Sequence, residues 1–163
     1  MLHEAENNLL KVQVEDYIDR RLNVTQPEFG NLPICPYAAK FRDSIKIKMA
    51  RNTPYEVLGW CVRNWSHMDV AWVYAWDKDS MPNPMIAEKI CDGFTPILHR
   101  MGATLLLDHP DITEPVGGVY TGFGDGMLII IQNTEILNRM RSQLLKTDYY
   151  KNWNDDDKRE LCE

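Results

Sequence analysis

The stretch Thr104-Leu-Leu-Leu-Asp-His-Pro-Asp111 joins an apolar run to an abrupt polar end. The apolar run indicates a buried strand, and Pro110 ends it because proline has no N–H for a sheet ladder. Asp108, His109 and Asp111 therefore follow the strand where it leaves the core. In α/β sheets, ligands bind at this carboxyl edge. The stretch predicts a strand and, beside it, the place of a binding site.

Two earlier segments also have the patterns of strands. Residues 44–50 alternate apolar side chains with lysines, and residues 70–76 are apolar on both faces, which is typical of a central strand covered on both sides. Between them, Thr53-Pro-Tyr-Glu56 forms a capping box with proline at the first helical position, which predicts a helix. A second helix opens at Asn83-Pro84, and Pro96 is expected to kink or split it. Two β-α-β units predict parallel strands.

The other predicted elements complete a mixed sheet. Gly124-Asp-Gly126 separates two apolar segments, residues 119–123 and 127–132, and predicts an antiparallel hairpin. Apolar periodicity also predicts helices over residues 5–22 and over a last segment from Asn133 or Thr134 to 145. Pro36 at a first helical position predicts a short helix over residues 35–41. We expect an α/β fold with helices on both faces of the sheet. A two-layer ferredoxin-like fold is the alternative, and it requires one predicted strand to be a loop.

Length and composition limit the classes to which the protein can belong. The 163 residues fit one domain (1–163), with an N-terminal helix and loop (1–34) and an acidic tail (154–163) that we expect to be flexible. The net charge of −6 argues against nucleic-acid binding, which needs a basic surface. No apolar run approaches the roughly 20 residues of a membrane span. The N-terminus lacks the features of a secretory signal, so we expect a cytoplasmic protein without membrane association.

The four cysteines do not form a recognisable motif. Cys35, Cys61, Cys91 and Cys162 are widely spaced, and no Cys-x-x-Cys pair occurs. In a reducing compartment they are expected to be free thiols. Cys61 and Cys91 lie on the apolar stripes of predicted helices and are expected in the core, as is the aromatic stripe Trp72, Tyr74 and Trp76.

Parallel strands would bring several polar residues to one edge of the sheet. The candidate ligand-binding residues are Arg51, Asp77 and Asp111, and the candidate catalytic residues are His109 and Asp108. Carboxylates with an imidazole are suited to acid–base chemistry or to a divalent metal, for which His109 and Asp111 are the candidate ligands. The competing interpretation is that strand ends meet polar loops and that Asp108 caps a turn.

His109-Pro-Asp111 also matches the His-x-Asp half of a non-haem iron site. Such sites need a second histidine downstream, and none follows His109. This argues against an oxygenase. The glycines at positions 117 and 118 loosen the loop after Pro110, which could cover the strand-end edge as a lid.

Cys35 is the third candidate catalytic residue. It directly precedes a short predicted helix with Pro36 at its first position, and the positive end of a helix dipole lowers the pKa of a thiol. With His109 as base, Cys35 could act as a nucleophile. The alternative is a small buried apolar residue in a structural turn.

The segment Asn31-Leu-Pro-Ile-Cys-Pro-Tyr-Ala38, together with His109-Pro-Asp111, resembles a bacterial family of uncharacterised small proteins. Members of that family carry a Leu-Cys-Pro-Phe-Ala segment near the start and a His-Pro-Asp after an apolar strand. The resemblance covers about fifteen residues and implies no activity. It suggests that the Cys-Pro turn and the His-Pro-Asp turn belong together.

Two functional hypotheses follow. The first is a small protein with a ligand-binding or catalytic site around Cys35, Asp77, Asp108, His109 and Asp111. The second is a non-catalytic interaction or structural module, expected to form a homo-oligomer, in which these residues only terminate strands.

Overall fold

A four-stranded mixed sheet lies at the centre of the computed structural model, which describes residues 2–112 and 114–160. Across the sheet the strands are β3 (Ile45–Met49), β4 (Ala71–Asp77), β6 (Gly126–Asn133) and β5 (Ala103–Asp108). β3 and β4 are parallel, and β6 is antiparallel to both of its neighbours, β4 and β5. β5 therefore runs in the same direction as β3 and β4. The predicted mixed α/β sheet is confirmed, and the carboxyl ends of these three strands lie at one end of it.

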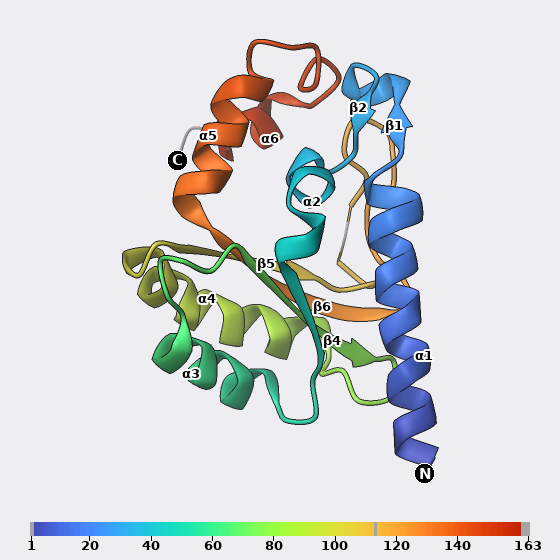
Figure 1. Cartoon of the computed structure of the whole chain (residues 1–163), viewed down its shortest axis with the longest axis vertical. Coiled ribbons are helices and arrows are strands. Elements are labelled where there is room, and N and C mark those ends of the chain that lie inside the picture. Colours follow the sequence, from blue (N-terminus) through green and yellow to red (C-terminus); the bar gives the residue numbers. More distant parts are fainter. Residues whose placement is uncertain (1, 113, 161–163) are drawn as a thin grey trace.

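One face of the sheet packs against α3 (Pro54–Asn64) and α4 (Pro84–Arg100) (Figure 1). The residues that were expected in the core and are buried in this layer are Trp72, Tyr74, Trp76, Cys61 and Cys91. These predictions are confirmed. α4 runs through Pro96 as one helix, so the predicted split does not occur.

The opposite face packs against α1 (Leu2–Tyr17) and α2 (Pro36–Lys40). α1 continues into a π-helical turn, η1 (Ile18–Leu22), and inserts Leu10 and Val14 over the buried side chains of β4 and β6. Helices therefore cover both faces of the sheet, as predicted (Figure 1). This distinguishes the fold from the ferredoxin-like alternative, whose helices share one face.

Smaller elements gather beyond one end of the sheet (Figure 1). They are β1 (Thr25–Gln26), η2 (Pro27–Phe29), β2 (Leu32–Pro33), η3 (Arg42–Ser44), α5 (Thr134–Leu144) and α6 (Asp155–Glu160). α6 shows that the acidic tail contains a short helix, and residues 161–163 lie outside the described part of the chain. None of the described helices is long and apolar enough to cross a membrane.

The hairpin predicted over residues 119–123 and 127–132 is wrong, since residues 119–123 form no strand. The fold's antiparallel hairpin is instead β1–β2. Val116 and Val119 pair across the Gly117-Gly118 turn. β6 inserts between β4 and β5, where Met127, Leu128, Ile129 and Ile131 are buried. A strand that is apolar on both faces gains more from this central position than from an edge hairpin.

Gly126 allows β6 to begin next to the end of β4. A Cβ atom at this position would clash with the carbonyl oxygen of Trp76. The glycine of the Asp-Gly dipeptide is therefore required by close packing between backbones rather than by a hairpin turn.

Side-chain caps define the starts of the three long helices that follow strands or loops. Thr53, Asn83 and Asn133 each accept a hydrogen bond from the backbone N–H three residues ahead. Thr53 and Asn83 were expected from the sequence, and Asn133 was one of two candidates for the last cap. All three satisfy N–H groups that have no partner inside the helix.

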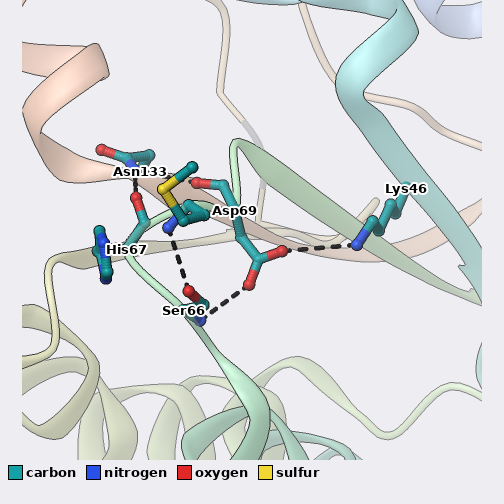
Figure 2. Close-up of polar contacts among 6 residues, drawn as sticks. Lys46, Ser66, His67, Asp69 and Asn133 are labelled. Atoms are coloured by element: carbon teal, nitrogen blue, oxygen red, sulfur yellow. Dashed lines mark hydrogen bonds and ion pairs between the residues drawn. The ribbon is translucent and has the colours of Figure 1, made fainter.

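Asn133 also anchors, through hydrogen bonds, the loop that leads into β4. Its Nδ2 donates to the carbonyl oxygens of His67 (3.1 Å) and Asp69 (2.9 Å), as Figure 2 shows for this loop. The Asp69 carboxylate accepts from the Ser66 N–H (2.8 Å) and lies 3.5 Å from Lys46 Nζ. Because Asn133 is almost fully buried, these bonds form away from water, and losing them would leave carbonyl groups unsatisfied.

The substitution Gly126→Ala is expected to lower the free energy of unfolding by about 2 kcal/mol or more, because the new Cβ overlaps the Trp76 carbonyl. Gly93→Ala is the matched control. Gly93 lies inside α4 with open space around its Cα, so alanine there is expected to stabilise by about 0.5–1 kcal/mol. Urea unfolding monitored by circular dichroism measures both, and equal effects of the two substitutions would contradict this account.

Asn133→Ala is expected to destabilise the protein by about 2 kcal/mol, because it removes a helix cap and two bonds to backbone carbonyls. Asn83→Ala removes only a cap, at an exposed position, and is expected to cost about 1 kcal/mol. The difference between the two variants in urea unfolding isolates the contribution of the loop bonds. No difference would mean that Asn133 serves only as a cap.

Candidate functional site

The carboxyl ends of β4 and β5 lie at the same end of the sheet but are not adjacent. Asp77 pairs with Gly126 and Asp108 pairs with Leu128, on opposite sides of β6. Since neighbouring strands lie about 5 Å apart, the backbones of β4 and β5 are separated by about 10 Å. The insertion of β6 thus divides the predicted cluster of polar residues.

Strand alternation divides it further. Leu105 and Leu107 of β5 pack into the layer of α3 and α4, so Asp108 projects from the other face, towards α1. His109 is the next residue, and its ring turns back to the α4 side, where Nε2 lies 2.9 Å from the carbonyl oxygen of Pro82. Successive residues of a strand point to opposite faces, which explains why Asp108 and His109 are neighbours in sequence but do not share a site.

His109 is fully buried, and both ring nitrogens are hydrogen-bonded to backbone groups. Nδ1 accepts a bond from the N–H of Asp111 (3.2 Å), so Nε2 carries the proton that is donated to Pro82. The Asp111 carboxylate lies 3.9 Å from Nδ1 and is mostly exposed. The geometry gives His109 a structural part: it ties the turn after β5 to the loop before α4.

Asp77 ends β4 and Arg51 follows the neighbouring parallel strand β3, and neither of them lines a cavity with Asp108. Oδ1 of Asp77 accepts bonds from the N–H groups of Asp79 (2.9 Å) and Ser80 (2.8 Å), which makes it the organiser of a turn. Arg51 lines a cavity of about 360 Å³ between the starts of α3 and α4. Among the described residues, no group of three or more His, Cys, Asp or Glu side chains is arranged to hold a metal ion.

Cys35 and Asp108, in contrast, line the same cavity, which has a volume of about 410 Å³. Its floor is the α1-facing side of β5 and β6, and its walls come from η1, the start of α2, α5 and residues 149–153. Leu106 lines the floor and is 51% exposed, so the cavity opens at the free edge of β5. Cys35 of the Cys-Pro segment therefore shares a cavity with Asp108, whereas His109 of the His-Pro-Asp turn does not line it.

Asp108 and Tyr17 form the polar part of the cavity. Oδ2 of Asp108 accepts bonds from the Phe123 N–H (3.0 Å) and, at 3.5 Å, from the Tyr17 hydroxyl. The same hydroxyl is hydrogen-bonded to the carbonyl oxygen of Thr121. Burial, followed by the charge of Asp108, raises the pKa of Tyr17 above its ordinary value, so the phenol stays protonated.

The expectation that a helix dipole lowers the pKa of Cys35 is wrong. Burial raises the pKa of this thiol, and the N–H groups of Ala38 and Tyr37, which favour the thiolate, offset only part of that effect. α2 is a single short helix of five residues. At neutral pH the thiol is therefore protonated, which disfavours the predicted nucleophile.

Sequence reasoning did not find the aromatic wall of the cavity. Phe29, Tyr149, Tyr150 and Trp153 pack together, with ring centroids 4.8 Å apart for Tyr149–Tyr150 and for Tyr150–Trp153. The Tyr149 hydroxyl also donates to the carbonyl oxygen of Ile34. The spacing Tyr-Tyr-x-x-Trp after the last long helix could have predicted this wall. Several aromatic side chains in a short polar segment indicate that they pack against another part of the protein.

The loop that was expected to act as a lid does contribute to this cavity. Glu114, Val116 and Thr121 line it, and Val116 and Val119 pack against the aromatic wall. The loop thus encloses the cavity on the α1 side of the sheet rather than the strand-end edge near Arg51.

Comparisons of the chain with protein-family models, with curated proteins and with solved structures gave no match. The resemblance to a bacterial family of small proteins stays a prediction.

Because its pKa is raised, Cys35 is expected to react slowly with iodoacetamide at neutral pH, about tenfold or more slower than in the urea-unfolded chain. The alkylation rate of Cys35 should keep rising with pH above the pKa of an ordinary thiol, where the alkylation rate of such a thiol levels off. Mass spectrometry of the peptide that contains Cys35 measures this rate, and the unfolded chain is the control. Faster alkylation in the folded protein would restore Cys35 as an activated nucleophile.

Proposed function

We propose that the protein binds a small organic molecule in the cavity lined by Cys35, Tyr17 and Asp108, which we call the Asp108 cavity. The observation that carries the proposal is the cavity itself. Its volume of about 410 Å³ lies within the range of about 300–1,000 Å³ that is typical of ligand pockets. Its walls are mostly apolar and aromatic, and its few polar groups come from separate elements of the fold, as in most ligand sites.

The polar groups are held in place before any ligand arrives. Thr121 and Phe123, from the loop before β6, bind the Tyr17 hydroxyl and the Asp108 carboxylate, respectively. Groups that are fixed in advance lose little conformational entropy on binding. The site is therefore prepared to recognise a ligand without rearrangement.

Trp153 supplies a further reason to expect a ligand. It lines the Asp108 cavity, and its buried indole N–H finds no hydrogen-bond acceptor among the described residues. A buried donor without a partner lowers stability, and such groups call for an explanation. An oxygen or nitrogen acceptor on a bound molecule would satisfy this N–H.

Protonation states favour binding over catalysis. Tyr17 and Cys35 both have raised pKa values, so at neutral pH both stay protonated and act neither as a base nor as a nucleophile. His109, the predicted acid–base residue, does not line the cavity and uses its ring nitrogens for backbone contacts. We therefore assign the site to recognition of a small molecule.

Leu106→Trp is expected to block the cavity, because a larger side chain at the half-exposed floor occupies the opening. Leu145→Trp is the matched control, since Leu145 is 62% exposed and does not line the cavity. A panel of small aromatic fragments is screened by ligand-observed NMR against the wild type and both variants. Fragments that bind the wild type and Leu145→Trp should lose at least about tenfold in affinity for Leu106→Trp.

Equal fragment binding by Leu106→Trp and by the wild type would remove the Asp108 cavity from consideration. A wild type that binds no fragment and instead forms stable dimers in light scattering would favour the second hypothesis from the sequence, a homo-oligomeric interaction module.

A further inference from the structure

We infer that the ligand of the Asp108 cavity is an organic cation, a protonated amine carried on an aromatic or other apolar body. This inference rests on the proposed function, because it names the chemical class of the molecule bound there. Three features of the cavity support it: the balance of charge along its lining, the number of aromatic rings, and the use that the chain makes of its own N–H groups.

The charge of the lining is negative. Three carboxylates line the cavity, those of Asp108, Glu114 and Asp157, against one guanidinium, that of Arg141. Asp108 is 7% exposed, so its charge is felt through protein rather than through water. A buried carboxylate attracts a cation more strongly than an exposed one, because less water screens its charge.

Arg141 belongs to a different part of the wall. It projects from α5 close to Tyr150, where burial raises the pKa of the phenol and the guanidinium opposes that rise. The acidic and basic groups are thus distributed over the lining, with the acidic Asp108 on the sheet floor and the basic group on the helical wall.

Aromatic rings suit the same ligand class. Six lining residues are aromatic: Tyr17, Phe29, Tyr37, Tyr149, Tyr150 and Trp153. The negative faces of such rings attract cations. The chain already shows this interaction, since the Arg21 guanidinium lies 5.1 Å from the ring centroid of Tyr17. The rings also offer apolar surface for the uncharged body of the ligand.

An anionic ligand is disfavoured because the backbone N–H groups near the polar part of the cavity are already used, which leaves the neutral indole N–H of Trp153 as the one unpartnered buried side-chain donor of a described lining residue. The backbone N–H groups of Tyr37 and Ala38, at the start of α2, are directed to the sulfur of Cys35. The N–H of Phe123 is bound to Asp108. An anion in the cavity would meet three carboxylates and would have Arg141 as its one basic side chain among the lining residues.

The test uses three molecules with the same indole body. Tryptamine carries an amine, 3-ethylindole is neutral, and indole-3-acetate is an anion. Dissociation constants are measured by ligand-observed NMR at neutral pH and low salt. We expect tryptamine to bind about tenfold more tightly than 3-ethylindole, which corresponds to about 1.4 kcal/mol. Indole-3-acetate is expected to bind most weakly.

Substitutions locate the charge that selects the amine. Asp108→Asn keeps the shape of the side chain and removes its charge, so it should lower the affinity for tryptamine about tenfold and leave that for 3-ethylindole unchanged. Asp77→Asn is the control, because Asp77 lies outside the cavity. If Asp108→Asn fails to fold, Glu114→Gln with Asp157→Asn replaces it. This pair should reduce the preference for tryptamine about two- to threefold.

The outcomes separate this inference from the proposed function. Equal binding of tryptamine and 3-ethylindole, or tightest binding of indole-3-acetate, would overturn the cationic class while leaving a small-molecule site in place. A preference for tryptamine that persists in Asp108→Asn, and in the Glu114 and Asp157 pair, would also overturn it. If neither the indoles nor any fragment of the wider panel binds, the proposed function fails together with this inference.

Discussion

The pairing of β6 between β4 and β5 is the constraint on which the rest of the structure depends. It requires Gly126, because any side chain there would meet the carbonyl of Trp76. It keeps β5 parallel to β4 in direction but sets the two strands about 10 Å apart. The polar residues after the strands are thereby distributed among separate environments, and the broad apolar face of β5 and β6 becomes the floor of the Asp108 cavity.

Local patterns in the sequence predict most of the framework. The caps at Thr53, Asn83 and Asn133 mark helix starts correctly because capping depends on residues only three positions apart. The doubly apolar β4 and its aromatic stripe predict a central strand covered by helices, and the structure confirms this. The position of β6 was not predicted, since an Asp-Gly turn signals a change of direction and carries no information about which distant strand will be the partner.

In the candidate site, too, features set by neighbouring residues could be predicted from the sequence, whereas features set by distant contacts could not. Cys35 and Asp108 line the same cavity, but the hypothesis also grouped His109 with Asp108, although strand alternation sends the two side chains to opposite faces. That separation could have been derived from the sequence. The raised pKa of Cys35 could not, because it results from burial by elements far along the chain. The aromatic wall of Tyr149, Tyr150 and Trp153 likewise depends on contact with Phe29, more than a hundred residues away.

The central claim is that ligands enter the Asp108 cavity rather than the strand-end edge around His109. Amide chemical-shift mapping of the labelled protein with a bound fragment tests this most directly. The account predicts shifts at Tyr17, Cys35, Asp108 and Met140, which line the cavity from α1, the position before α2, β5 and α5. Shifts confined to Arg51, Asp77 and the His109 turn, with the cavity residues unchanged, would contradict it.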